Sequence, residues 1–179
     1  MAGGQRERAI LLTGMMGCGK SVVGRTLAAR LGWRFIDTDA EIERKAGCSV
    51  AEIFRQEGEA GFRALERAEI AELPSERAVV ALGGGALAQA ENRAVLQQRG
   101  VIVWLDAEPE TLLDRIGESD GRPLLAGLNA ADRRDRLSTL RDERAESYGE
   151  AEVRVVTDGC TPEQVRDAVL VALGREHAA

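Results

Sequence analysis

Eight residues near the N-terminus have the types and spacing of a phosphate-binding loop. The pattern G-x-x-x-x-G-K-[ST] is matched without a gap by Gly14-Met15-Met16-Gly17-Cys18-Gly19-Lys20-Ser21. In such a loop the backbone N–H groups point at phosphate oxygens, the lysine reaches the β- and γ-phosphates, and the hydroxyl binds Mg²⁺. The residues expected to contact the nucleotide here are Gly17, Cys18, Gly19, Lys20, Ser21 and Val22.

The residues on either side of this loop predict a strand before it and a helix after it. Residues 9–13 are a continuous apolar run, and apolar side chains recur after the loop at helical spacing until Gly32. Lys20 is one of only two lysines in a chain that otherwise uses arginine. A compact ammonium fits inside a ring of backbone amides where a planar guanidinium would not. The alternative is a glycine-rich turn before a helix, but the order strand, loop, helix favours a nucleotide site.

Two carboxylates follow the second predicted strand, which spans residues 34–37. Asp37 and Asp39 lie two residues apart, so they point to the same side if the strand continues. Beside a phosphate and Mg²⁺, one carboxylate can hold a metal-bound water, and the other can accept a hydrogen bond from an attacking hydroxyl. The alternative is that Asp39 only caps the helix that begins at Ala40.

Three consecutive glycines, Gly83, Gly84 and Gly85, end the third predicted strand. This is a costly choice unless the backbone must approach another group closely, which a bound substrate would explain. A tight turn is the alternative. Ligands of parallel sheets bind outside the carboxyl ends of the strands, so we expect the loop, the carboxylates and the glycines at one edge.

Three arginines are candidates for binding anionic groups. Arg63 lies in a helix predicted over about residues 59–73, and Arg144 lies near the end of an arginine-rich helix. Arg122 follows the polar stretch 117–121, which is typical of a mobile loop that closes over transferring phosphates. Each arginine taken alone is more typical of solvated surface.

Apolar runs alternate with helical patterns along the chain, which predicts an α/β fold. The expected strands span residues 9–13, 34–37, 78–83, 101–106 and 153–157. Three of them are continuous apolar runs, as strands covered on both faces should be. Capping boxes at Ser49 and Thr161 start two of the helices. We predict one domain over residues 1–179, a three-layer α/β/α sandwich around a five-stranded parallel sheet.

Composition excludes several classes of protein. The net charge of −6 and the 3% aromatic content argue against binding to nucleic acid or to a membrane surface. No apolar run approaches the roughly 20 residues that span a bilayer. Cys18, Cys48 and Cys160 are too few and too far apart for a disulfide framework or a zinc site, so we expect reduced thiols in the cytoplasm. A monomer is the default expectation.

Together these residues make the chain similar to the shikimate kinase family, small enzymes of the nucleoside-monophosphate-kinase-like P-loop group. The phosphate loop alone would indicate only a P-loop protein, whereas the other motifs in this order are more selective. The resemblance extends from the phosphate loop nearly to the C-terminus. The matching motifs are Gly14 to Ser21, Asp37-Thr38-Asp39, Phe62-Arg63 with Glu66, Gly83-Gly84-Gly85, Arg122-Pro123-Leu124-Leu125, and Arg144 with Tyr148.

The resemblance implies a P-loop kinase fold with a mobile lid over about residues 117–128 and a shikimate-binding region over about 37–66 and 83–92. It implies transfer of the ATP γ-phosphoryl group to the 3-hydroxyl of shikimate, a step of the chorismate pathway to the aromatic amino acids. The implied cofactors are ATP and Mg²⁺.

The resemblance also implies a role for each matching residue. Catalysis is assigned to Lys20, Asp39 and Arg122. The metal is assigned to Ser21 and, through water, to Asp37. Shikimate binding is assigned to Asp39, Arg63, Arg144 and the glycines Gly83, Gly84 and Gly85. Arg122 also contacts the nucleotide phosphates. Some relatives carry an arginine beside the adenine near Cys160, which this chain lacks, so adenine contacts are expected instead from Arg115 and the backbone around Pro162.

The sequence departs from the family around the second carboxylate-binding arginine. The usual pattern is Arg-x-Pro-Leu-Tyr, whereas this chain has Arg144-Ala145-Glu146-Ser147-Tyr148, which leaves Arg141 as a competitor. Two other functions also stay open. A small sugar-acid kinase, such as a gluconate kinase, would keep the chemistry and change the acceptor. A non-catalytic nucleotide-binding module would keep only the phosphate loop.

Overall fold

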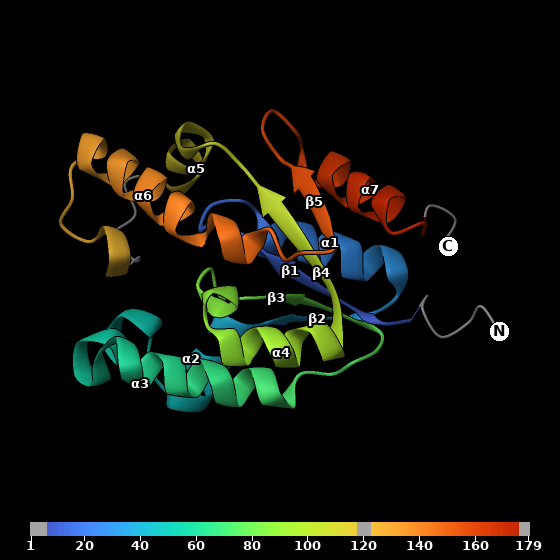
Figure 1. The fold of residues 1–179 in the computed structure, drawn as a ribbon, viewed down its shortest axis with the longest axis horizontal. Helices are drawn as coiled ribbons and strands as arrows, with labels where there is room; N and C mark the ends of the chain where they lie inside the picture. Colours follow the sequence, from blue (N-terminus) through green and yellow to red (C-terminus); the bar gives the residue numbers. More distant parts are fainter. Residues whose placement is uncertain (1–6, 118–122, 176–179) are drawn as a thin grey trace.

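The computed structural model describes residues 7–117 and 123–175, and these form an α/β fold around one parallel sheet (Figure 1). The five strands of the sheet are arranged in the order β2-β3-β1-β4-β5. They are β1 (Ala9–Thr13), β2 (Arg34–Asp37), β3 (Ala78–Ala81), β4 (Gly100–Asp106) and β5 (Val153–Val156). All four strand pairings are parallel, as the continuous apolar runs predicted.

Helices cover both faces of this sheet. The chain crosses from β1 to β2 in one direction and from β3 to β4 in the other, so right-handed connections place the intervening helices on opposite faces. One face carries α1 (Lys20–Leu31), which packs against α7 (Pro162–Ala172). The other face carries α4 (Ala90–Arg99), with α3 (Val50–Glu72) packed against it (Figure 1). The predicted three-layer sandwich is therefore confirmed.

The remaining helices lie near the carboxyl edge of the sheet or beside it. They are α2 (Thr38–Ala46), α5 (Pro109–Ile116), α6 (Ala130–Tyr148) and the 3-10 turns η1 (Ala86–Ala88) and η2 (Pro123–Leu125). Helix α6 contacts both α5 and η1. It therefore bridges the two sides of the carboxyl edge, where the predicted site residues gather.

The core explains why the strands form where they do. Residues Ala9 to Leu12 of β1 and Ala78 to Val80 of β3 are completely buried between the helical layers. The predicted strands 78–83 and 153–157 are each longer than the observed β3 and β5. Leu82 and Thr157 still donate ladder-type hydrogen bonds, to Leu12 and Asp106, but the chain leaves the sheet there. Such differences of one or two residues are usual at strand ends.

Helix α3 combines the two helices that the sequence predicted, one opened by the capping box at Ser49 and one over about residues 59–73. It begins at Val50, after Ser49 accepts a hydrogen bond from the Glu52 N–H, and it is broken at Gly58, where φ is 70° and ψ is −174°. The predicted capping box at Ser49 is only half formed, because the Glu52 carboxylate binds Arg55 and Gln56 instead. The box at Thr161 forms completely. Across the described part of the chain, every helix is too short or too polar to span a membrane.

Candidate active site

Two pockets open side by side at the carboxyl edge of the sheet. The first has a volume of about 470 Å³ and contains the phosphate loop. The second has a volume of about 320 Å³ and contains the glycine triplet Gly83 to Gly85. Met16 and Asp39 line both pockets. The two pockets are therefore adjoining halves of one site, with Asp39 at the junction.

The phosphate loop has the geometry that its sequence predicts. Gly14, Gly17 and Gly19 have φ angles of 137°, 81° and 100°, which favour glycine. A Cβ on Gly14 would lie 2.3 Å from the carbonyl oxygen of Leu105, so the loop can pack against the end of β4 only without a side chain there. Gly19 precedes α1 and offers no side-chain cap, which leaves the first N–H groups of the helix for an anion.

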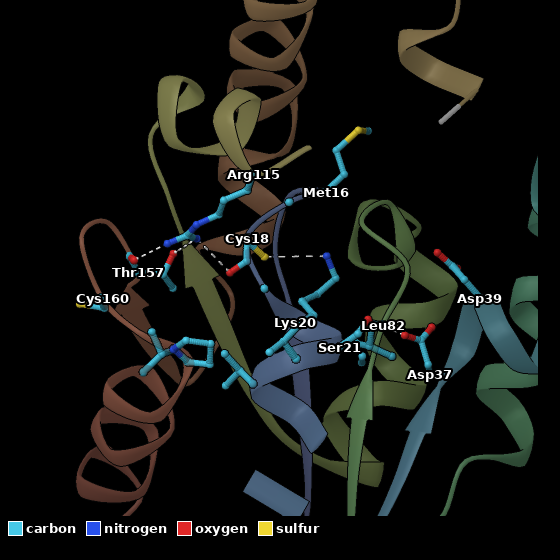
Figure 2. A pocket seen from close by; sticks show the side chains of 17 residues that line it. Met16, Cys18, Lys20, Ser21, Asp37, Asp39, Leu82, Arg115, Thr157 and Cys160 are labelled. Carbon is cyan, nitrogen blue, oxygen red and sulfur yellow. Dashed lines mark hydrogen bonds between the residues drawn. The ribbon is translucent and has the colours of Figure 1, made fainter. Parts of the chain in front are cut away.

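The Lys20 ammonium lies over this loop. It donates hydrogen bonds to the carbonyl oxygens of Gly14 (2.8 Å) and Met15 (3.0 Å). Figure 2 shows Lys20 between Arg115 at one end of the pocket and Asp37 and Asp39 at the other. The ammonium is therefore placed to bind the terminal phosphates of a nucleotide that runs along the pocket. The Cys18 thiol is buried in the core, 3.8 Å from the Lys20 nitrogen. A bound phosphate would therefore meet the backbone of Cys18 and not its thiol.

Ser21 and Asp37 meet at the acidic end of the pocket. The Ser21 hydroxyl donates a 2.6 Å hydrogen bond to the Asp37 carboxylate. That carboxylate also accepts a 3.4 Å hydrogen bond from the Ala40 N–H, so Asp37 is the N-cap of α2. The alternative that Asp39 caps this helix is therefore wrong, because the strand ends and the helix begins two residues earlier than that interpretation requires.

The Ser21–Asp37 pair fits a Mg²⁺ ion shared with a nucleotide better than it fits a metal ion held by protein ligands alone. Both groups offer hard oxygen ligands. Within residues 7–117 and 123–175, no cluster of three or more His, Cys, Asp or Glu side chains could hold a metal ion. An ion here would need phosphate and water oxygens to complete its shell, which is the usual coordination of Mg²⁺ beside a nucleotide.

Arg115 closes the far end of the nucleotide pocket. Its guanidinium donates to the hydroxyl (2.9 Å) and the carbonyl (2.7 Å) of Thr157 and to the carbonyl of Cys18 (3.5 Å). Pro162 and the half-exposed Val22 line the same pocket. Arg115 and Pro162 therefore line the same pocket as the phosphate loop, and their contact with a nucleobase stays a prediction.

In the second pocket, Arg63 is held by two carboxylates of its own helix. It donates to Glu66 at 2.9 Å and to Glu59 at 3.2 Å. Glu66 is completely buried, and burial raises the pKa of its carboxyl, as does the charge of Asp39, whereas Arg63 opposes the increase. Arg63 is thus fixed in place, with a side chain that is 12% exposed.

The glycine triplet makes room for these charged groups. A Cβ on Gly83 would lie 2.7 Å from a Glu66 carboxylate oxygen and 3.0 Å from Asp39. A Cβ on Gly85 would lie 2.6 Å from the Arg63 guanidinium. The backbone therefore approaches charged side chains closely, which explains Gly83 and Gly85 better than a turn alone; that a substrate lies on the triplet stays a prediction. The Thr38 hydroxyl holds the triplet, since it accepts from the Gly83 N–H at 3.0 Å.

Arg144 and not Arg141 reaches the second pocket. Arg144 is buried and lies 3.2 Å from the position of a Cβ on Gly84. Arg141, three residues earlier on α6, binds Glu108 at 2.9 Å and Asp106 at 3.4 Å instead. The rotation of α6 thus separates the two candidates that the sequence left open.

Sequence reasoning gave no role to the apolar wall of the second pocket, although Phe62, Pro123 and Leu124 belong to the matching motifs. Val50, Phe54, Phe62, Pro123 and Leu124 line it. The rings of Phe54 and Phe62 lie 4.9 Å apart, on either side of the break in α3. Because the chain has few aromatic residues, the closeness of Phe54 and Phe62 in the sequence was the available signal for this wall. Arg122, which directly precedes Pro123 in the sequence, lies outside the described residues.

Comparisons with known proteins agree with this geometry. The family model described as shikimate kinase matches residues 16–173. A shikimate kinase of Gloeobacter violaceus (strain ATCC 29082 / PCC 7421) is 51% identical over 155 residues, which is 86% of this chain and 85% of that protein. One of Synechococcus sp. (strain CC9605) is 45% identical over 168 residues, 93% of this chain and 82% of that protein.

Solved structures give the same result. Shikimate kinase from Acinetobacter baumannii in complex with shikimate superposes with a TM-score of 0.88 at 38% identity, over 97% of each chain. A gluconokinase from Sinorhizobium meliloti 1021 gives a TM-score of 0.55 at 24% identity, over 94% of this chain and 92% of that one, a likeness that shows the fold alone.

Proposed function

The chain belongs to the shikimate kinase family and is a phosphotransferase, and from this premise we propose how its two pockets carry out the reaction. The reaction is transfer of the ATP γ-phosphoryl group to the 3-hydroxyl of shikimate, which gives shikimate 3-phosphate and ADP. The observation that carries the proposal is that Asp39 and Met16 line both pockets. A hydroxyl bound beside Asp39 in one pocket can therefore reach a terminal phosphate in the other.

In the nucleotide pocket, the phosphates of ATP bind the loop amides and the start of α1. Lys20 exchanges its hydrogen bonds to Gly14 and Met15 for bonds to phosphate oxygens. Ser21, with Asp37 through water, would hold Mg²⁺, which would supply positive charge beside the transferring phosphate. Arg115 and Pro162 border the adenine.

In the acid pocket, the guanidinium groups of Arg63 and Arg144 bind the shikimate carboxylate, because planar forks match carboxylates well. Asp39 accepts a hydrogen bond from the 3-hydroxyl and orients it for attack. The apolar wall that includes Phe54 and Phe62 contacts the carbocyclic ring. Arg122, which we assign to the transferring phosphate, completes the set in sequence but lies outside the described residues.

Turnover of shikimate with Mg-ATP tests the proposal, with ADP release as the readout. We expect the parent protein to be active, Asp39→Asn to lose most of its kcat with little change in KM, and Arg63→Ala to raise KM for shikimate. Arg141→Ala is the matched control, because Arg141 faces away from the pocket. Equal activity of the parent and Asp39→Asn would remove Asp39 from the mechanism. An acceptor panel that includes gluconate tests the alternative substrate, and absence of ADP release with every acceptor would favour a binding module.

Several finer properties belong to the same proposal. We propose a single domain that acts as a monomer in the cytoplasm, with no nucleic-acid or membrane partner. We also propose a lid over about residues 117–128, of which residues 118–122 lie outside the described residues. The three cysteines are free thiols, which agrees with a reducing compartment. Sedimentation of the purified protein at several concentrations tests the monomer.

A further inference from the structure

Tyr148 is the last residue of α6, and its side chain ends on the glycine triplet. The residue is 1% exposed, and its hydroxyl donates a 2.6 Å hydrogen bond to the carbonyl oxygen of Gly84. Its ring packs against Trp104 of β4, with the ring centroids 5.6 Å apart. Tyr148 therefore reaches through the core to the middle glycine of the acid pocket.

The same hydroxyl also lies beside the phosphate loop. It is 3.7 Å from the sulfur of Met15, and the Arg144 guanidinium is 3.8 Å from that sulfur. Gly84 lies close to the phosphate loop as well, since a Cβ on it would lie 3.3 Å from the Gly14 carbonyl oxygen. The phosphate loop, the glycine triplet and the end of α6 thus meet at one point.

We propose that Tyr148 is a positioning residue that sets the orientation of the Gly84–Gly85 peptide and, through it, the affinity of the acid pocket for shikimate. The inference rests on the proposed function of that pocket. In a planar trans peptide the Gly84 carbonyl and the Gly85 N–H point in opposite directions. A hydrogen bond that fixes the carbonyl therefore also fixes the direction of the Gly85 donor.

The triplet needs such a restraint because glycine has the widest choice of backbone angles. Thr38 holds the Gly83 N–H at one end of the triplet, and the Gly85 carbonyl begins the η1 turn at the other. Tyr148 holds the peptide between them. Burial raises the pKa of Tyr148 to about 12, so its hydroxyl remains a donor at neutral and moderately alkaline pH.

The variant Tyr148→Phe tests the proposal, because it keeps the ring and its contact with Trp104 and removes only the hydroxyl. Ser147→Ala is the matched control. Ser147 is also buried, and its hydroxyl donates to the Arg144 carbonyl of its own helix at 3.0 Å without reaching the glycines. Both variants therefore lose one buried hydroxyl on the same turn of α6. The measurements are KM for each substrate, kcat and calorimetric shikimate binding, all at a temperature well below unfolding. The melting temperature of each variant is measured separately.

We expect Tyr148→Phe to raise KM and Kd for shikimate about fivefold to tenfold, the loss of one hydrogen bond to a buried carbonyl. We expect its KM for ATP, and every constant of Ser147→Ala, to stay within about twofold of the parent. A shikimate Kd of Tyr148→Phe within that range would overturn the proposal, and so would an equal rise in the KM for ATP. If the parent fails to phosphorylate shikimate, the proposed function fails. If the parent is active and Tyr148→Phe binds shikimate as the parent does, only the role of Tyr148 fails.

Discussion

Replacing Arg144 by lysine tests which arginine of α6 binds the substrate carboxylate. The change keeps the positive charge and removes the planar fork, so it isolates geometry from charge. Arg144 is 8% exposed and lies against Gly84 and Met15, where a shorter ammonium cannot present two parallel donors. Arg141→Lys is the control on the same helix, since its partners are Glu108 and Asp106.

The expected size of the effect follows from the bonds that are lost. A hydrogen bond to a charged group contributes about 1.5–3 kcal/mol, so Arg144→Lys should raise KM for shikimate about 10- to 150-fold. KM for ATP should change little, because the nucleotide pocket does not include Arg144. Initial rates of ADP release at varied shikimate and saturating Mg-ATP measure this. If Arg141→Lys gives the large effect and Arg144→Lys the small one, the assignment is reversed and the reasoning from the rotation of α6 is refuted.

Three further predictions concern the phosphate loop, the metal and a buried carboxyl. Lys20→Ala should lower kcat about 10²- to 10³-fold, the loss of one preorganised donor, and an unchanged kcat would exclude Lys20 from the transition state. Ser21→Ala should raise the Mg²⁺ concentration needed for half-maximal rate, because the ion then loses the hydroxyl ligand that lies 2.6 Å from the Asp37 carboxylate; a titration with Mg²⁺ at fixed ATP shows whether it does. Glu66→Gln should gain stability relative to the parent as pH rises. A carboxyl whose pKa is raised by burial stabilises the fold fully below its unfolded pKa and loses that contribution as pH rises through the folded value, and glutamine does not titrate. Urea unfolding of both proteins at pH 4 and at pH 7 measures the difference in unfolding free energy between the variant and the parent. An equal difference at the two pH values would show that Glu66 does not titrate in this way.

The parts of the site that the sequence predicts are those that local chemistry determines. The phosphate loop follows from glycines that need positive φ and from a lysine and a serine at fixed offsets. The five strands follow from apolar runs, and their parallel order places Asp37, Gly83 and the loop at one edge. These features depend on neighbours in sequence or on the sheet alone.

The parts that the sequence does not predict depend on contacts between distant segments. Arg141 and Arg144 are equivalent in a helical pattern, and only the folded structure separates them: Arg141 binds Asp106, at the end of β4, whereas Arg144 is buried beside Gly84. The helical segments on either side of Gly58 were expected from the sequence, but nothing local shows how the break at Gly58 sets one against the other. That break brings Phe54 against Phe62 and builds the apolar wall.

The order of the strands explains why one site can hold two substrates in register. Strand β3 lies between β2 and β1, so the carboxyl ends of the three strands carry Asp37, the glycine triplet and the phosphate loop as consecutive neighbours. Adjacent strands lie about 4.8 Å apart, so these groups span roughly 10 Å, which is the scale of a small acid beside a terminal phosphate. Phosphoryl transfer asks the protein mainly for positioning and charge. A rigid sheet edge with glycine at its centre supplies the first, and the paired arginines and Lys20 supply the second.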